Sequence, residues 1–229
     1  MERLRTTAKW QLYYDYQSIQ TNSSVSILSL NTCNLNAHMD DILNDYDIMQ
    51  SDIMCLQETH MALCMQNKQF PNHNCISSYI THGVMILVKK HVPILDHIHI
   101  EEKNVELVLA IFFSHGTEVA ILNLYVAPHV AFSNIVNVIS NTLDHFHMNG
   151  SIVLVGDFNI DMLQNIGRTK ELQNYMCKYS LRFLLNNTTH LQNTLIDHVW
   201  SNVPISKYSM FVLDTYWSDH DTIGIALEL

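Results

Sequence analysis

The sequence predicts a layered α/β fold. Strand-like apolar runs recur from residue 25 to the end of the chain, and amphipathic helical patterns lie between some of them. Several of the runs are apolar almost throughout, which is typical of strands that are covered on both faces. The runs over 82–90 and 105–126 predict hairpins, which a purely parallel sheet would not contain.

The strand predictions rest on apolar alternation or on continuous apolar stretches of strand length. Six such runs are followed by a last strand near the end of the chain. They cover residues 25–31, 52–58, 82–90, 105–113, 117–126, 151–159 and 222–227. In addition, His97 and His99 alternate with isoleucines, which predicts the solvent face of an edge strand.

Three helices are predicted from apolar residues spaced three and four positions apart. The first carries this pattern over 39–46 and the third over 172–179. The second covers 132–146, with Ser133 as a candidate N-cap.

The composition predicts one globular domain. The chain has 229 residues, of which 48% are hydrophobic and 15% charged, so it holds enough apolar material for one large core. This balance excludes a disordered chain, a coiled coil and a collagen-like repeat. We expect the domain to cover residues 25–229 and to form a monomer. Residues 1–24 are polar and aromatic without clear periodicity, and we expect them to be an arm or a remnant of an upstream domain.

The net charge of −10 argues against an extended basic surface for nucleic acid, so any such contact should be local or metal-assisted. Five cysteines without a C-x-x-C pair, together with the lack of an apolar signal segment, favour a reducing compartment. We therefore expect an intracellular protein, cytoplasmic or nuclear, that is not secreted. The apolar runs fall far short of the roughly 20 residues that cross a bilayer, so no membrane association is expected.

Polar residues gather where the predicted strands end. A single residue of this kind is usually a turn or cap former, but five strand ends or strand starts with a carboxylate, amide or imidazole point to a site. Two of these five positions lie near the end of the chain, one after the short run Thr194–Ile196 and one before the last strand. The residues are Asn31, Glu58, Asp157 with Asn159, Asp197, and Asp219 with His220.

This set of side chains favours metal-assisted hydrolysis. Carboxylate and amide oxygens suit Mg²⁺ or Mn²⁺, which needs few protein ligands. A carboxylate with an amide two residues later can orient and deprotonate an attacking water. An imidazole held by a second carboxylate can donate to a phosphoryl oxygen.

Six segments in order resemble motifs of the endonuclease/exonuclease/phosphatase (DNase I-like) superfamily: LSLNTCNL, DIMCLQETH, ILNLYVAP, LVGDFNID, LIDHVWSN and WSDHDTIGIAL. Within it, the chain is most similar to apurinic-type endonuclease domains of mobile elements, of the non-LTR retrotransposon or Helitron type. The resemblance implies a four-layer α/β sandwich with two packed mixed β-sheets flanked by helices. It also implies a Mg²⁺- or Mn²⁺-dependent phosphodiester hydrolase that acts on DNA. An upstream helicase or reverse-transcriptase domain in a longer parent protein would fit the N-terminal arm.

The resemblance implies which residues hold the metal. Glu58 matches the metal-binding glutamate of the family, Asn31 matches the amide that supports it, and Asp219 lies beside the metal. Many relatives carry an aspartate two positions after this asparagine, whereas this chain has Cys33. A second metal contact at that position is therefore not expected.

The resemblance also assigns the residues that act on the phosphate. Asp157 matches the residue that activates or positions the water, and Asn159 matches a phosphate contact. His220 matches the imidazole that polarises the phosphate, and Asp197 matches the carboxylate that orients and charges it. Tyr125 matches a tyrosine that contacts the scissile phosphate. Abasic-site enzymes often have an asparagine three residues after this tyrosine; here the position holds a proline, so abasic-site preference is not supported.

A local basic segment offers candidate substrate contacts. Residues 164–184 carry a net charge of +3 in an acidic protein and follow the GDFN motif directly. Our hypothesis is that Arg168 and Lys170 contact backbone phosphates of the substrate. A solvated loop explains the same residues equally well.

Three functions stay open from the sequence. The leading one is a divalent-metal-dependent phosphodiesterase that nicks DNA. The second is a phosphatase or phosphodiesterase for a small or lipid phosphoester, which the net charge of −10 keeps open. The third is an inactive mobile-element fragment, against which the retention of the main site residues argues.

Overall fold

The computed structural model describes residues 24–61, 69–78, 81–114, 116–145, 150–164 and 167–228. The arm predicted over residues 1–24 lies outside these ranges except for its last residue. Within the described ranges the strands form two sheets of six strands each.

The first sheet brings the two ends of the described chain side by side. Its strands are β1 (Ser24–Asn31), β2 (Ile53–Gln57), β3 (His73–Ser78), β4 (Val84–Lys89), β11 (Tyr208–Leu213) and β12 (Thr222–Glu228). Their order is β11-β12-β1-β2-β4-β3. Because β1 runs parallel to β2 and antiparallel to β12, the sheet is mixed, as the sequence predicts.

The second sheet takes its strands from the middle of the chain. They are β5 (Ile94–Glu102), β6 (Val105–Ser114), β7 (Thr117–Val126), β8 (Ser151–Asp157), β9 (Arg182–Phe183) and β10 (Asp197–Ser201). Their order is β5-β6-β7-β8-β10-β9, with β7 and β8 parallel and the other neighbours antiparallel. β5 lies at the edge of the sheet with His97 and His99 exposed, which confirms the edge-strand prediction.

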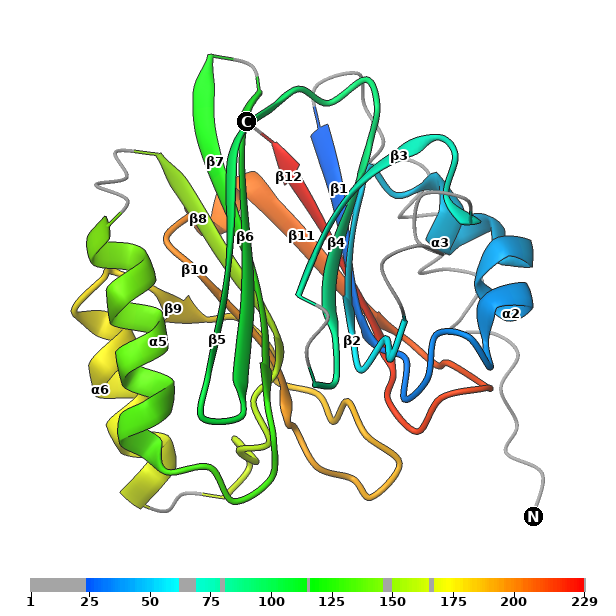
Figure 1. Ribbon diagram of the computed structural model, residues 1–229. Coiled ribbons are helices and arrows are strands. Elements are labelled where there is room, and N and C mark those ends of the chain that lie inside the picture. The colour runs from blue at the N-terminus through cyan, green and yellow to red at the C-terminus, as the bar shows by residue number, and fades with distance from the viewer. Residues whose placement is uncertain are drawn as a thin grey trace.

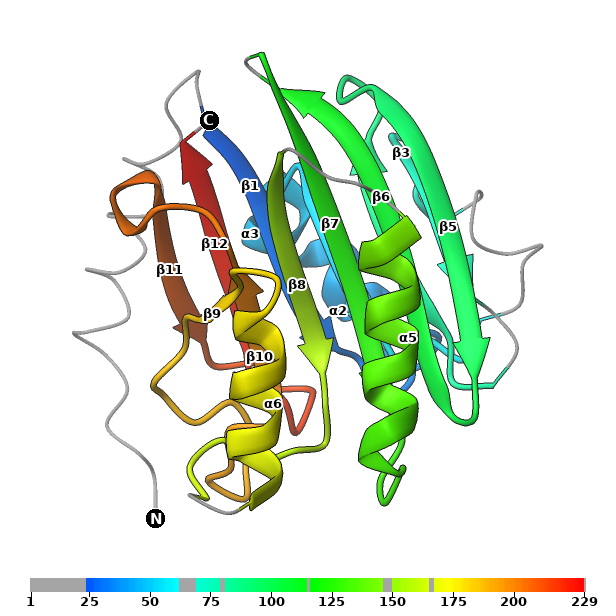
Figure 2. The same ribbon diagram turned by 90° about the vertical axis from the view of Figure 1, so that its left-hand side faces the viewer.

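Helices cover the outer faces of the two packed sheets, which gives four layers (Figure 1). The helices α2 (Met39–Asn44) and α3 (Tyr46–Gln50) lie on the first sheet. The helices α5 (Phe132–His145) and α6 (Gly167–Cys177) lie on the second, and Figure 2 shows both in front of its strands. A short 3₁₀ helix, η1 (Ile205–Lys207), precedes β11. The predicted four-layer sandwich is confirmed.

The two-residue period of the strands divides the apolar side chains between the layers. In β6, Val108, Ala110 and Phe112 join the core between the sheets, whereas Leu107 and Leu109 face the core beneath α5 and α6. A third core lies beneath α2 and α3. This double coverage explains why most of β6 is apolar without interruption.

Three local predictions differ from the structure. The first predicted helix is divided at Asp45, whose side chain accepts hydrogen bonds from two backbone N–H groups and caps α3. The N-cap prediction for Ser133 is wrong, because α5 already begins at Phe132. The strands β3 and β11 were not predicted: both lie at sheet edges, where β3 has a largely polar sequence and β11 is only partly buried.

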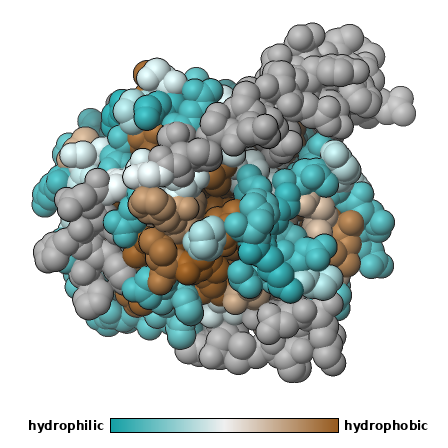
Figure 3. All heavy atoms as spheres, turned by 90° about the horizontal axis from the view of Figure 1, so that it is seen from above, coloured by the Kyte–Doolittle hydropathy of each residue, from teal (hydrophilic) through white to brown (hydrophobic). Residues whose placement is uncertain are grey.

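The two ends of the sandwich differ in character. Seen from above, the end that carries the C-terminus exposes hydrophobic residues among hydrophilic ones (Figure 3). The strand ends with the predicted polar residues lie at the opposite end. Among the described helices, none has the length and apolar character needed to span a membrane.

Candidate active site

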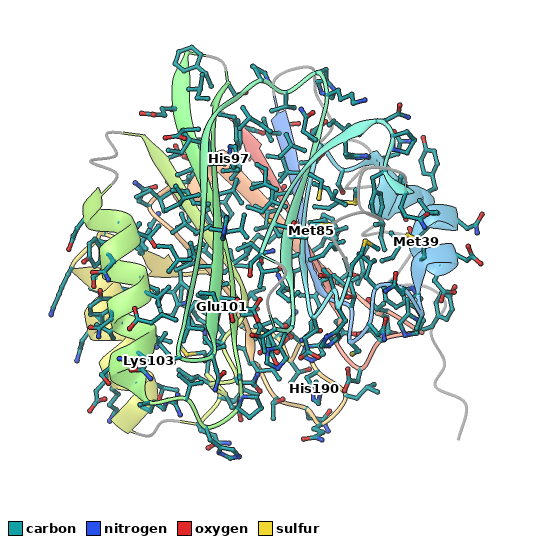
Figure 4. All side chains as sticks on the ribbon, in the orientation of Figure 1. Met39, Met85, His97, Glu101, Lys103 and His190 are labelled. Atoms are coloured by element: carbon teal, nitrogen blue, oxygen red, sulfur yellow. The ribbon has the colours of Figure 1, made fainter. Side chains whose placement is uncertain are left out.

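One end of the sandwich collects the strand ends that carry the predicted polar residues. Asn31 ends β1, and Glu58 directly follows the parallel strand β2. The parallel strands β7 and β8 place Tyr125 opposite Asp157. Carboxyl ends of parallel strands meet at one edge of a sheet, which is where α/β folds commonly carry their sites. This is the lower end of the molecule in Figure 4, where His190 is labelled.

Asp197 reaches the same place from the opposite direction. The short run Thr194–Ile196 that precedes it forms no strand. β10 begins at Asp197, and because β10 runs antiparallel to β8, its first residue pairs with Asp157, the last residue of β8. Asp197 therefore lies beside Asp157.

The side-chain amide of Asn31 joins carboxylates from the two sheets. Its Nδ2 donates to Oε1 of Glu58 and to Oδ2 of Asp157, both at 3.0 Å. Its Oδ1 accepts from the backbone N of Cys33 at 2.9 Å. Asn31 and Asp157 are buried, whereas the Glu58 side chain is 25% exposed. The amide therefore fixes the distance between a buried and an accessible carboxylate.

Three residues next to these strand ends have left-handed backbone conformations. Cys33, Glu58 and Asn159 have φ values of 54°, 49° and 48°. Positive φ is uncommon for residues other than glycine, and such conformations cluster at functional sites. The turns after β1, β2 and β8, which lie at the same end of the molecule, thus each contain an energetically unfavourable backbone conformation.

Asp197 and His220 form a buried ion pair. The imidazole Nδ1 lies 2.9 and 3.0 Å from the two carboxylate oxygens of Asp197. Burial disfavours the charged imidazole, but the charge of Asp197 and the hydrogen bond to it outweigh this and raise the pKa of His220 to about 9. With Nδ1 engaged, Nε2 is the nitrogen left for a substrate. Near neutral pH the ring is an imidazolium and a hydrogen-bond donor.

Asp157 is a buried carboxyl group whose pKa is raised. Burial contributes most and the charge of Asp197 adds to it, so the pKa of Asp157 reaches about 8. The charge of His220 and hydrogen bonds from Asn159 and Asn31 act in the opposite direction. The backbone N of Asn159 donates to Oδ1 of Asp157 at 2.9 Å. A base whose pKa lies near the working pH exchanges protons efficiently.

Tyr125 lies between the carboxylates of the two sheets. Its side chain is buried, and burial raises the pKa of its hydroxyl group, followed by the charge of Glu58 and a hydrogen bond to the Glu58 carboxylate. The charge of Asp157 adds to the same effect. The phenol is therefore protonated, and its hydroxyl group acts as a hydrogen-bond donor.

Asp219 is held from both sides. Cys33 Sγ donates to its Oδ1 at 2.8 Å, and His190 Nε2 lies 3.3 Å from its Oδ2. The backbone N of Gln192 donates to Nδ1 of His190 at 3.1 Å, so the ring hydrogen is on Nε2 and is donated to Asp219. The pKa of Asp219 is lowered: burial raises it, but the bond from Cys33 and the charge of His220 outweigh burial.

His190 was not among the residues predicted from the sequence. Its position depends on pairing between two loops, since Leu191 N donates to Asp219 O and Asp221 N donates to Thr189 O. This pairing places His190 opposite His220. No local pattern in the sequence encodes such a contact.

The donor set fits a hard divalent cation. Asn31 holds the accessible carboxylate of Glu58 beside that of Asp157, which gathers hard oxygen atoms at one place. A carboxylate-rich set of this kind suits Mg²⁺ or Mn²⁺. Burial and then the charge of Asp197 raise the pKa of Asp157, and a cation bound nearby would favour its ionised form.

The two predicted phosphate-contact residues lie on α6. Arg168 is partly buried and donates from Nη2 to the backbone oxygen of Val130 at 2.7 Å. Lys170 is exposed. Among the described residues, neither side chain hydrogen-bonds to the groups described above, so their contact with substrate stays a prediction.

One protein-family model matches most of the chain. The model of the endonuclease/exonuclease/phosphatase family matches residues 28–220, which include all the site residues described above. The chain belongs to this family. Superfamily members are hydrolases that act on phosphodiester bonds. The identification from the six sequence motifs is confirmed. No curated protein sequence matches the chain.

Solved structures share the fold at low sequence identity. The endonuclease domain of TRAS1, a telomere-specific non-LTR retrotransposon, is 16% identical with a TM-score of 0.69, covering 90% of this chain and 99% of that domain. TDP2 from D. rerio, complexed with a single-strand DNA product, is 13% identical with a TM-score of 0.68, covering 91% and 100%. The human Nocturnin catalytic domain is 13% identical with a TM-score of 0.65, covering 90% and 94%. At these identities the comparisons establish the fold.

Proposed function

We propose that this chain is a divalent-metal-dependent phosphodiester hydrolase that nicks DNA. The observation that carries the proposal is the buried Asp197–His220 pair beside Asp157, with Asn31 linking Asp157 to Glu58. This places a donor, a base and an accessible acidic ligand around one space. A purely structural role would not require three carboxylates in such close contact.

The residues divide the work of hydrolysis in the following way. Asp157 accepts the proton of the attacking water as the water oxygen bonds to phosphorus. The Nε2–H of His220 and the hydroxyl of Tyr125 donate to non-bridging phosphate oxygens, where negative charge grows before the bond to the leaving oxygen breaks. Glu58, with Asn31 and Asp219 nearby, would hold Mg²⁺ or Mn²⁺. The bound cation would supply positive charge to the phosphate and the leaving oxygen.

The proposal includes a mobile-element origin and DNA as the substrate. The similarity of the fold to a retrotransposon endonuclease domain and to a DNA-bound TDP2 supports it. We further propose that the chain acts inside the cell as a monomer, within a longer parent protein that carries a helicase or reverse-transcriptase domain. Arg168 and Lys170 would contact the DNA backbone.

A second candidate is hydrolysis of a small or lipid phosphoester. The net charge of −10 favours it, because an acidic protein attracts a polyanion weakly. The same set of residues would serve either substrate.

Incubation with supercoiled plasmid and Mg²⁺ or Mn²⁺ tests the proposal, with EDTA and His220→Ala as negative controls. His97→Gln is the matched control, since His97 is exposed on β5 (Figure 4). Metal-dependent nicking that is lost in His220→Ala supports the proposal. Hydrolysis of a phosphomonoester without nicking would favour the second candidate, and turnover of neither substrate would indicate an inactive fragment.

A further inference from the structure

A second carboxylate–imidazole pair lies beside Tyr125, formed by Glu106 and His82. Glu106 lies on β6 opposite Tyr125 and is completely buried. Its Oε1 accepts from the backbone N of His82 at 2.8 Å and lies 3.2 Å from His82 Nδ1. Its Oε2 accepts from Gly83 N and Ser78 Oγ, both at 3.0 Å. A carboxylate surrounded by donors of this kind acts as an acceptor, so Nδ1 of His82 carries the hydrogen.

The imidazole of His82 faces the candidate active site. Its ring centroid lies 4.8 Å from that of Tyr125 and 5.9 Å from that of His60. His60 Nε2 is in turn 3.9 Å from Oε2 of Glu58. The side chain of His82 is 27% exposed, and in the described part of the chain Nε2 has no hydrogen-bond partner. The ring therefore lines the Glu58 side of the site with one nitrogen free.

The backbone holds this ring at a fixed place relative to Glu58. Thr59 N donates to Gly83 O at 3.0 Å, and His60 N donates to His82 O at 2.8 Å. Gly83 has a φ of 87°, and a Cβ at this position would overlap Thr59 Oγ1. Only glycine permits this approach, so the turn after Glu58 and the turn at His82 are joined closely.

The bond to the imidazole is not needed to hold the turn. Three other donors, the backbone N of His82, the backbone N of Gly83 and Ser78 Oγ, already satisfy the Glu106 carboxylate. Glu106 instead fixes which nitrogen of His82 is free and where it points. The same relation exists between Asp197 and His220. Both imidazoles precede strands of the first sheet, His82 before β4 and His220 before β12, whereas their carboxylate partners lie on β6 and β10 of the second sheet.

We propose that His82 is a substrate-binding residue that contacts the phosphate next to the scissile one, with Glu106 as its positioning residue. The inference rests on the proposed phosphodiester hydrolysis and deepens it. When substrate is bound, Nδ1–H donates to Glu106 and Nε2–H donates to a phosphate oxygen. The contact selects substrates with at least two phosphodiester groups, which means polynucleotides over small phosphoesters.

The test compares two substrates. A short DNA duplex has phosphates next to the cleaved one, whereas bis(4-nitrophenyl) phosphate has a single phosphodiester. His82→Gln should raise KM for the duplex by about 10- to 100-fold, the value of one hydrogen bond to a charged group. The same substitution should raise KM for bis(4-nitrophenyl) phosphate much less. His97→Gln is the control for removing an exposed imidazole.

Two further measurements test the contact between His82 and the phosphate independently of folding defects and of catalytic turnover. Duplexes in which one neighbouring phosphate is replaced by an uncharged methylphosphonate should bind the wild-type protein more weakly at one position, and His82→Gln should not respond to that replacement. Anisotropy titration of the duplex in EDTA measures binding without cleavage. If wild-type protein cleaves neither substrate, the hydrolase proposal fails, and the binding comparison still decides the role of His82. Equal losses on both substrates, an unchanged KM for the duplex, or equal sensitivity of both proteins to the methylphosphonate would overturn the inference.

Discussion

Replacing Asp197 by Asn should lower the pKa of His220 and shift the pH dependence of activity. The substitution keeps the size of the side chain and removes its charge. In the wild-type protein both oxygens of Asp197 lie within 3.0 Å of His220 Nδ1, and the side chains of His220 and Asp197 are only 7% and 3% exposed. Solvent therefore screens their attraction poorly.

The size of the effect follows from the raised pKa. A rise from the ordinary value of 6.5 to about 9 corresponds to about 3 kcal/mol in favour of the imidazolium. Without the charge of Asp197, its largest favourable partner, burial pushes the pKa of His220 down, while the charges of Asp157 and Asp219 still favour the imidazolium. A smaller fraction of molecules would then carry the imidazolium near neutral pH. With the loss of ring orientation, kcat/KM should fall by about 10²- to 10⁴-fold.

The assay is kcat/KM for DNA nicking as a function of pH, together with an NMR titration of the His220 ring. In Asp197→Asn the alkaline limb should move to lower pH. His220→Ala should cost at least as much, and the double variant should cost little more, because groups that act as a unit are not additive. Asp96→Asn, at an exposed position on β5, is the matched control. Additive losses with an unmoved alkaline limb would refute the role of the pair, as would a lowered melting temperature without any kinetic change.

Three further predictions concern the metal, the salt dependence and the fold. Glu58→Gln should raise the metal concentration needed for half-maximal nicking, since the site loses one negative charge; an identical Mg²⁺ titration would exclude Glu58 as a ligand. With only 12 lysines and arginines in the chain, DNA binding should weaken with salt less steeply than a log–log slope of about −6, and a steeper measured slope would contradict the small contact surface. Gly156→Ala should lower the melting temperature and the activity together, because Gly156 has a φ of 130° and a Cβ there would overlap the backbone of Leu124; a thermal melt like that of the wild type would contradict the close strand approach.

The sequence by itself determined the class of fold and most of the polar residues that the structure brings together at the candidate site. Strand-length apolar runs predict covered strands because burial on both faces removes the usual alternation, and this holds for β4, β6 and β8. Motif residues such as Asn31, Glu58 and Asp157 were found because they immediately follow or end such runs. Edge strands such as β3 and β11 escaped prediction, since a partly exposed strand has no need of a continuous apolar sequence.

Only the tertiary structure decided which polar groups touch. Asn31 lies 126 positions from Asp157, and nothing local to either residue predicts the bond between them. His190 and Cys33 meet at Asp219 because loops from distant parts of the chain pair through their backbones. The orientation of the His82 ring depends on its hydrogen bond to Glu106, which lies on β6 in the other sheet. Short-range patterns record whether a residue is buried, whereas hydrogen-bond partners and shifts in pKa depend on distances that only the packed chain creates.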